Sequence, residues 1–374
     1  MNKNLFALIL LILSIFVAGS AFAAGREVLY AFDADYPPHT YLENGKPVGF
    51  DIEILKAILK DREVSIAYKP MQWAEVQEKL KKGEVHITSG MAKTEERRKL
   101  YRFADLPVSD LRITLFTTQK ANIKSLKDLR DKKVATQRGS LYQTLLEKKE
   151  INPALFETEA EALLSLAKNE SHAFAGTEDT AFFNIKRYGL KGVFPVSTPL
   201  MVSSIYYVIR NGDETLLSMV NEGMERIRRD GTYDRIYRKW FVEEVTHDDI
   251  IRMLEKAKEA SSYAYAPYSN FSVGAAVLGA SGKIYSGCNI ENAILGYTTT
   301  AAKVAVYKAI SEGEGHFKAV LSLLPGGKIA APAPDERQIV HEFGRGTLVV
   351  LDSGKGGYRT VMISELLPYA FQLQ

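Results

Sequence analysis

The sequence predicts an α/β protein, because segments with the pattern of strands alternate with segments that have the pattern of helices. Residues 28–32 form a short apolar stretch typical of a buried strand, and residues 85–88 form a second one. Between them lie two runs, 52–59 and 73–80, in which apolar side chains recur at helical spacing. The short connections between these elements favour parallel strands.

The alternation continues as far as residue 241. The further elements predicted here are a strand at 134–136, a helix at 141–150, a longer helix at 214–229 and a short basic and aromatic helix that ends at 240–241. Ser140 has the side chain and the position of an N-cap for the helix at 141–150. Together with Gly139 it opens this helix, and free backbone N–H groups at a helix start favour an anion.

A second domain begins where Thr246 and Asp249 have the spacing of a capping box. The elements predicted after this point are helices at 250–260, 298–312 and 337–343, and strands at 272–278, 320–324 and 348–351 with one more ending at 288. They describe a small α/β domain that starts with a hairpin. We expect domains at residues 25–244 and 248–374, closely joined because no linker rich in proline or glycine separates them.

The first 24 residues have the order of a secretory signal peptide. Lys3 is followed by an apolar run at 5–17 and by the small-residue triplet at 21–23. The run is shorter than the roughly 20 apolar residues that a membrane span needs. We therefore expect a periplasmic or otherwise exported protein that is soluble after cleavage of residues 1–24.

Charge and cysteine content narrow the classes of function. The net charge of +3 is spread over acidic and basic residues in both halves, which argues against nucleic-acid binding. Cys288 is the single cysteine, so no intramolecular disulfide can form and packed cores must supply the stability.

The N-terminal domain contains the groups that are needed to bind a free amino acid. Such a site needs a cation for the carboxylate, an acid for the ammonium group and an apolar or aromatic wall. Arg97 is the candidate cation. The candidate acids are Asp33, Glu178 and Asp179, and the candidate walls are Tyr36 and Trp73.

At these residues the sequence resembles the bacterial extracellular solute-binding proteins that include amino-acid receptors of ABC transporters. The matching pieces are Asp33-x-x-Tyr36-x-Pro38, Gly49-Phe50-Asp51, Trp73, Thr94-x-Glu96-Arg97, Gln137-x-Gly139-Ser140 and Asp230-Gly231-Thr232-Tyr233. The resemblance implies a bilobal type II periplasmic-binding-protein fold that closes on its ligand. It also implies capture of a small amino-acid-like solute for uptake or sensing, with a membrane permease as a partner.

The same resemblance assigns roles to the candidate residues. Arg97 would bind the carboxylate, with help from Ser89, Gly90 and the Ser140 backbone. Asp33 would take the ammonium group together with either Glu178 or Asp179, and the sequence leaves open which of these two it is. His39 departs from the family pattern beside the pocket, so the side-chain preference stays open too.

The C-terminal domain resembles cytidine deaminases, which implies a three-layer α/β/α fold. The matching segments are 266–271, 287–292, 308–313, 337–338 and 364–371. A deaminase of this kind needs zinc held by one His or Cys and two further Cys, and a catalytic glutamate. Here the three zinc-ligand positions are Thr300, Ala333 and Glu336, and the glutamate position is Ala302. We therefore expect no metal, no cofactor and no deamination.

Three alternatives remain for this domain. Phe271, Asn289 and Glu291 match family positions that contact the nucleoside, so the domain would bind a nucleoside without turnover. The same residues would otherwise serve packing and turns, in a domain that joins copies of the chain into a homo-oligomer. The third alternative is an exported zinc-dependent cytidine deaminase with an accessory binding domain.

Overall fold

The computed structural model describes residues 25–196, 199–354, 357–368 and 370–371, so the predicted signal peptide lies outside the described residues. The chain forms two compact units, and each is considered by itself. The first holds residues 25–121, 129–194 and 200–229, and the second is mainly residues 230–371. In the described part of the chain, no helix has both the length and the apolar character needed to cross a membrane.

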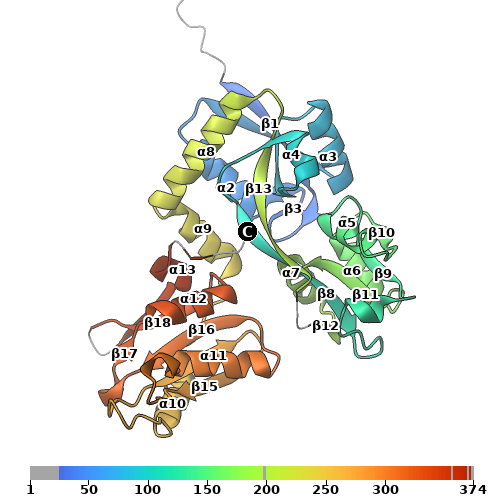
Figure 1. Ribbon diagram of the computed structural model, residues 1–374. Helices are drawn as coiled ribbons and strands as arrows, with labels where there is room; N and C mark the ends of the chain where they lie inside the picture. Colours follow the sequence, from blue (N-terminus) through green and yellow to red (C-terminus); the bar gives the residue numbers. More distant parts are fainter. Residues whose placement is uncertain (1–24, 197–198, 355–356, 369, 372–374) are drawn as a thin grey trace, which may run out of the picture. The chain divides into compact units, whose positions relative to one another are not determined.

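The first unit is built on one continuous mixed sheet, which has ten strands within the described residues (Figure 1). The order is β10-β9-β11-β8-β13-β6-β1-β5, with β12 (Val193–Pro195) beside β8 and β7 (Tyr101–Phe103) beside β13. The remaining bounds are β1 Arg26–Asp33, β5 Val64–Met71, β6 Ile87–Ala92, β8 Ser109–Thr118, β9 Val134–Gln137, β10 Ala154–Phe156, β11 Ala173–Thr177 and β13 Met201–Arg210. As predicted from the short connections, β1 runs parallel to β6. It also runs parallel to β5, and β9 runs parallel to β10 and β11, three strands that were not predicted from the sequence.

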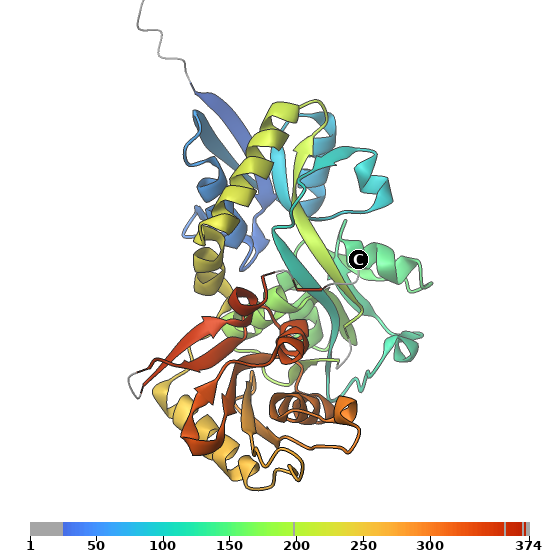
Figure 2. The ribbon, with the colours of Figure 1, turned by 60° about the vertical axis from the view of Figure 1, so that its left-hand side comes forward.

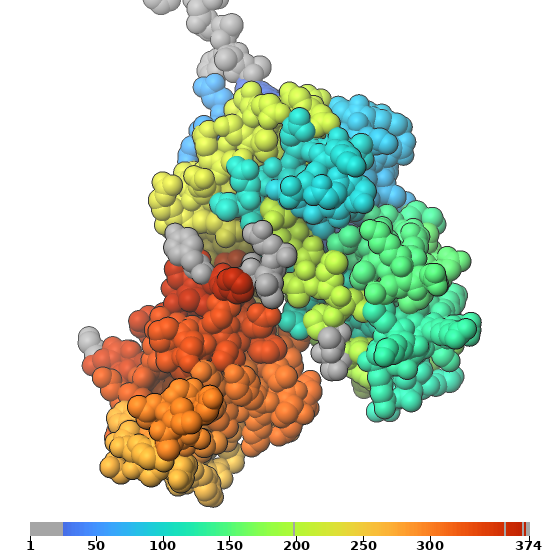
Figure 3. All heavy atoms as spheres, viewed as in Figure 1, coloured from blue at the N-terminus to red at the C-terminus, as the bar shows by residue number. Residues whose placement is uncertain are grey.

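Two long strands divide this sheet into two lobes. The β8 and β13 strands pair antiparallel over residues 109–113 and 201–205. Beyond that overlap β13 joins β6 in one lobe, and β8 joins β11 in the other. The space-filling view shows the same division, with blue, cyan and yellow residues in one lobe and green residues in the other (Figure 3). The first lobe is therefore completed by a late segment of the chain.

Amphipathic helices cover both lobes. The first lobe carries α2 (Phe50–Leu59), α3 (Trp73–Lys82), α4 (Glu95–Arg98) and α8 (Glu214–Arg229), and α8 packs on α2 (Figure 2). The second lobe carries α5 (Leu141–Glu147), α6 (Glu159–Ala167) and α7 (Glu178–Tyr188). A small sheet of β2 (Asp35–Tyr36), β3 (Thr40–Glu43) and β4 (Lys46–Val48) follows β1. Ser140 caps α5 as predicted, since its hydroxyl accepts a 3.1 Å hydrogen bond from Gln143 N.

The second unit is a sheet packed between helices. Within the described residues, this sheet has six strands. The strand order is β15-β14-β16-β18-β19 with β17 beside β16. The strands are β14 Gly274–Gly279, β15 Ile284–Cys288, β16 Phe317–Leu323, β17 Ile329–Ala330, β18 Leu348–Asp352 and β19 Tyr358–Met362. The helices are α10 His247–Ser261, α11 Ala301–Ser311, α12 Pro334–Glu342 and α13 Ile363–Leu366. Separate apolar clusters fill the two faces of the sheet.

The helix α9 (Thr232–Phe241) belongs to the second unit by its contacts. The Arg345 guanidinium stacks on the rings of Tyr233 and Tyr237 and lies 3.6 Å from the Asp234 carboxylate. Judged by residue contacts, the second unit therefore begins at Asp230. The sequence pattern of the second domain begins later in the chain, near residue 248. The predicted capping box of Thr246 and Asp249 is present at the start of α10.

Candidate functional site

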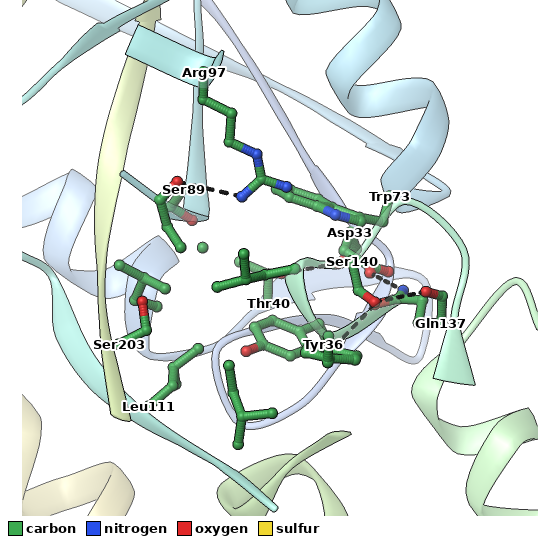
Figure 4. Close-up of a pocket in the computed structure, with 16 residues that line it drawn as sticks. Asp33, Tyr36, Thr40, Trp73, Ser89, Arg97, Leu111, Gln137, Ser140 and Ser203 are labelled. Atoms are coloured by element: carbon green, nitrogen blue, oxygen red, sulfur yellow. Dashed lines mark hydrogen bonds between the residues drawn. The ribbon is translucent and has the colours of Figure 1, made fainter. Parts of the chain in front are cut away.

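A pocket of about 510 Å³, open solvent at its mouth included, lies in the first unit. Seven of the ten predicted ligand-binding residues line it, namely Asp33, Tyr36, Trp73, Ser89, Gly90, Arg97 and Ser140. Arg97 and Trp73 point into the cavity from one side, and Tyr36 lies on the opposite side (Figure 4). Residues that are remote in sequence therefore converge on one cavity, as the binding hypothesis requires.

Arg97 presents a guanidinium group that has no acidic partner in the part of the chain that the structure describes. It lies on the short helix α4, whose start is fixed by a hydrogen bond from Arg97 N to the Thr94 hydroxyl. Its Nη1 donates to Ala92 O at 3.3 Å, and its Nη2 donates to Gln77 Oε1 at 3.2 Å. Burial lowers the pKa of the guanidinium. A desolvated cation with only neutral acceptors favours an incoming carboxylate.

Gly139 does not line the pocket, contrary to the role that we expected. Its carbonyl oxygen accepts hydrogen bonds from three side chains of the other lobe, namely Trp73 Nε1 at 3.2 Å, Gln77 Nε2 at 3.1 Å and Arg97 Nη2 at 3.4 Å. Its N–H donates to Gln143 Oε1 at 2.7 Å, so that donor is used within the loop. Gly139 has a φ of +74°, and a Cβ there would lie 2.8 Å from Gln77 Nε2. Its place is therefore between the lobes.

Asp33 is the acidic group of the pocket. It ends β1 and is buried, and its Oδ2 accepts a 2.6 Å hydrogen bond from Gln137 Nε2 on the other lobe. Asp35 N donates to its Oδ1 at 3.1 Å. Burial raises the pKa of Asp33 to about 6. The carboxyl is thus ionised at neutral pH at an energetic cost, which a cationic group in the pocket would offset.

A second buried acid, Glu159, lies behind the wall of the pocket. Its carboxyl accepts hydrogen bonds from the Tyr142 hydroxyl and from Thr177, at 3.2 Å from the backbone N and 3.1 Å from the hydroxyl. Burial raises the pKa of Glu159 well above the usual value for a glutamate. The sequence does not single out Glu159, because an acid in the first turn of a helix is the ordinary pattern of a solvated helix start.

The aromatic wall at Tyr36 is supported by His39. The two rings stack with their centroids 5.0 Å apart and their planes at 20°. The His39 ring is fully buried, and its Nδ1 lies 3.3 Å from Oδ1 of the buried Asp51. The side chain at which the sequence departs from the family pattern therefore holds Tyr36 in place and does not line the pocket.

Neither Glu178 nor Asp179 lines the pocket. We expected one of these two acids to join Asp33 there, and the structure places neither of them in the cavity wall. The Glu178 carboxylate accepts a 3.0 Å hydrogen bond from Arg112 Nε and a 2.5 Å hydrogen bond from the Thr114 hydroxyl. The Asp179 carboxylate lies 3.9 Å from His39 Nε2. Both acids start α7, and their carboxylates meet these partners.

The rest of the pocket wall is uncharged. These lining residues were not predicted from the sequence, and they are Thr40, Ala92, Leu111, Ile113, Gln137, Leu141, Tyr142, Ser203 and Ile205. Leu111 and Ile113 come from β8, and Ser203 and Ile205 from β13. These positions alternate along the two strands, so the period of two places them on one face. Gln137 alone stood in a quoted motif, which is the signal that could have found it.

In the second unit, the replaced zinc-ligand positions lie at the starts of two neighbouring helices. Thr300 precedes α11 and Ala333 precedes α12, and Lys303 of α11 pairs with Asp335 of α12. Glu336 is buried, and its Oε2 accepts a 2.6 Å hydrogen bond from Ala333 N, so it caps its own helix. Among the described residues, no group of three His, Cys, Asp or Glu side chains is placed to hold a metal.

The predicted nucleoside-binding residues make local contacts. The Asn289 side chain accepts a hydrogen bond from Val273 N at 2.8 Å and donates to Phe271 O at 2.9 Å. The Glu291 carboxylate accepts from Tyr268 N at 2.9 Å and from the backbone and side chain of Ser269. Both polar groups therefore fix the loop at 268–273, and the Phe271 ring is exposed.

Two family models match the chain. Bacterial extracellular solute-binding proteins, family 3, match residues 28–243, and the cytidine and deoxycytidylate deaminase zinc-binding region matches residues 247–345. A cytidine deaminase of Sporosarcina psychrophila is 39% identical over 124 residues, which are 33% of this chain and 91% of that protein. The probable amino-acid-binding protein YxeM of Bacillus subtilis is 27% identical over 216 residues, 56% of this chain and 81% of that protein.

Solved structures give the same result for the first unit. An ancestral arginine-binding protein bound to arginine has 32% identity and a TM-score of 0.54, covering 57% of this chain and 98% of that one. A histidine kinase sensor domain similar to periplasmic binding proteins has 27% identity and a TM-score of 0.56, covering 59% of this chain and 97% of that one. The bilobal fold is therefore of the periplasmic-binding-protein type, as predicted, and it is followed by a deaminase-like domain.

Proposed function

Because the chain belongs to the bacterial extracellular solute-binding proteins of family 3 through residues 28–243, we propose that its first unit captures a small amino-acid-like solute. Through its second unit the chain also belongs to the cytidine deaminases. One observation carries the proposal: the desolvated Arg97 guanidinium has no acid partner in the described structure and shares a pocket with the buried Asp33. A zwitterion supplies the missing counter-charge for each of them.

Isothermal titration calorimetry of the full chain against the common amino acids tests this proposal. We expect saturable heat from at least one of them at one site per chain. A binder also stabilises the folded state, so a thermal-shift screen should rank the same compounds in the same order. If the complete amino-acid panel gave neither heat nor a shift in melting temperature, the proposal would be wrong.

We further propose that this capture takes place outside the cytoplasm and serves an ABC-type permease or a sensor. The basic and apolar order of residues 1–24 and the extracellular role of the family support export. Cell fractionation and N-terminal sequencing of the mature protein test it. A mature N-terminus near Ala24 in the exported fraction is the expected result, and a cytoplasmic protein that keeps Met1 would contradict export.

For the second unit we propose that zinc-dependent deamination is lost. The residues at the zinc positions are Thr300, Ala333 and Glu336, and the last of these is held by its own helix. The opposing hypothesis, an exported cytidine deaminase, needs a metal-bound water as its nucleophile. Metal analysis of the purified chain separates the two, and zinc at one ion per chain with loss of cytidine absorbance would overturn the proposal.

A second role, association between copies of the chain, is favoured by an exposed apolar patch on this unit. The patch consists of Tyr265, Tyr268, Phe271, Ile290, Ile294, Leu295 and Tyr297. Backbone hydrogen bonds join its two segments, because Tyr265 N donates to Asn289 O and Glu291 N donates to Tyr265 O. Large exposed apolar patches mark interaction sites, and the proposed partner is a second copy of this chain.

A further inference from the structure

We infer that the ligand of the first unit carries one carboxylate, one cationic group and no further charge; this rests on the proposed function. Among the described residues that line the pocket, Arg97 is the one cation and Asp33 the one anion. A ligand with one charge of each sign therefore pairs every charge in the cavity.

None of three further acids near the pocket, Glu178, Asp179 and Glu159, lines the cavity. The carboxylate of Glu178 is held by Arg112 and Thr114 and does not line the cavity. The Glu159 carboxyl lies behind the Tyr142 hydroxyl and Thr177, in a fully buried place that favours its neutral form. Both groups are already hydrogen-bonded within the protein, so neither is free to meet a cationic side chain.

The remaining wall suits an uncharged group. Leu111, Ile113 and Ile205 are apolar, and the polar side chains beside them, those of Thr40 and Ser203, are neutral hydroxyls. Arginine or lysine would bring a second cation with no carboxylate to pair it, and glutamate would bring a second carboxylate with no cation. An unpaired buried charge is strongly unfavourable, so both classes should bind more weakly than a net-neutral amino acid.

Calorimetry on the full chain at pH 7.5 tests this inference with defined probes. The net-neutral probes are leucine, glutamine, phenylalanine and 4-aminobutyrate, and the charged probes are arginine, lysine and glutamate. We expect the tightest binder to be net-neutral and the charged probes to bind about 100-fold more weakly or not at all. Tightest binding of a charged probe would overturn the inference and leave the proposed function standing. Absence of binding by every probe and by the complete amino-acid panel would overturn both.

A single substitution gives an independent test. Ser203→Asp adds a carboxylate to the pocket wall at a half-buried position, so it should raise the affinity for arginine or lysine about tenfold and lower that for the best net-neutral probe. Val202→Asp is the matched control, because Val202 is 58% exposed, precedes Ser203 on the same strand and does not line the pocket. If Ser203→Asp bound net-neutral probes normally and gained nothing for arginine or lysine, pairing of charges would not set the preference.

Discussion

The Arg97 guanidinium donates a hydrogen bond to the carbonyl oxygen of Gly139, with Nη2 and O 3.4 Å apart. Arg97 belongs to one lobe and Gly139 to the other, so this contact joins the lobes beside the binding cavity. The bond is long and its acceptor is neutral, and a carboxylate is a stronger acceptor for a guanidinium. A ligand carboxylate should therefore replace this contact and hold the lobes together more firmly than the carbonyl does.

Replacing Arg97 by alanine should abolish solute binding. The change removes the one cation of the described pocket lining and costs about 3 kcal/mol or more, which corresponds to at least about 100-fold in affinity. Arg97→Lys keeps the charge but loses the planar paired donors, so we expect an intermediate loss. Calorimetry with the best-binding amino acid measures both variants.

Arg98→Ala is the control for this experiment. Arg98 lies next in sequence, but its side chain is 55% exposed and pairs loosely with Glu95 on the surface of α4. Its loss should leave the dissociation constant within about twofold, because exposed ion pairs contribute little. Equal losses in the Arg97 and Arg98 variants would show that the short helix as a whole, and not the Arg97 guanidinium, sets the affinity.

Replacing Asp33 by asparagine should stabilise the ligand-free protein at pH 7.5 while weakening ligand binding. Burial raises the pKa of Asp33 from 3.8 to about 6, so the native state is stabilised by a protonated Asp33 and loses this contribution as the pH rises through 6. The shift corresponds to about 3 kcal/mol at neutral pH. The asparagine side chain carries no charge and should keep the contact with Gln137.

Thermal unfolding at two pH values measures this effect. At pH 7.5 the Asp33→Asn variant should melt several degrees above the natural protein, whereas below pH 4 the two should coincide, because Asp33 is then protonated in both states. Affinity for an ammonium-bearing ligand should fall in the natural protein between pH 7 and pH 5. A variant that was less stable at pH 7.5 would contradict the view that the ionised Asp33 carries an unfavourable burial energy.

Most pocket residues of the first lobe could be predicted from the sequence, whereas the pocket residues of the long strands β8 and β13 could not. Asp33, Trp73 and Arg97 each belong to a local pattern, in which a strand end, a helix start or a capped turn fixes the side chain. Leu111 and Ser203 lie opposite each other in the β8–β13 pair. That pairing joins segments far apart in the chain, and no local pattern shows which face of such strands will meet a cavity.

Glu178 shows why an acid next to a strand end is an ambiguous signal. The structure places it at the start of α7, directly after β11, where it could face either the pocket or the neighbouring strand. The choice depends on Arg112 and Thr114 of β8, whose side chains take up both carboxylate oxygens. Such a choice is made by tertiary contacts, and a single sequence does not reveal it.

The apolar patch on the second unit should drive association in solution. Leu295 and Tyr297 are its most exposed members, at 75% and 71%. Light scattering coupled to gel filtration should give a mass above that of one chain for the natural protein. The double variant Leu295→Glu, Tyr297→Glu should have a mass close to that of one chain, because buried charges destabilise an apolar interface. Leu100→Glu, at an exposed apolar position of the first unit, is the control and should not change the mass. A monomeric natural protein would contradict this role.

Restoring the thiols at the zinc positions should restore metal binding. Thr300 and Ala333 stand at the starts of α11 and α12, two helices in contact, and Glu336 lies in the first turn of α12. Three thiolates plus a water complete a tetrahedral zinc site. The variant Thr300→Cys, Ala333→Cys, Glu336→Cys, purified with reductant and zinc, should therefore carry about one zinc ion per chain by elemental analysis.

The matched variant Thr300→Cys, Ala333→Cys, Glu336→Ser has only two thiols and should not retain zinc through gel filtration. Adding Ala302→Glu to the three-thiol variant supplies the missing acid and base, and a rise in cytidine deamination would follow if the nucleoside still fits. Ala302 is buried, so this last step should lower stability, and zinc content is the more direct measurement. If the three-thiol variant bound no zinc, the starts of α11 and α12 would not form a metal-binding geometry, and the loss of deamination would have a cause beyond the replaced ligands.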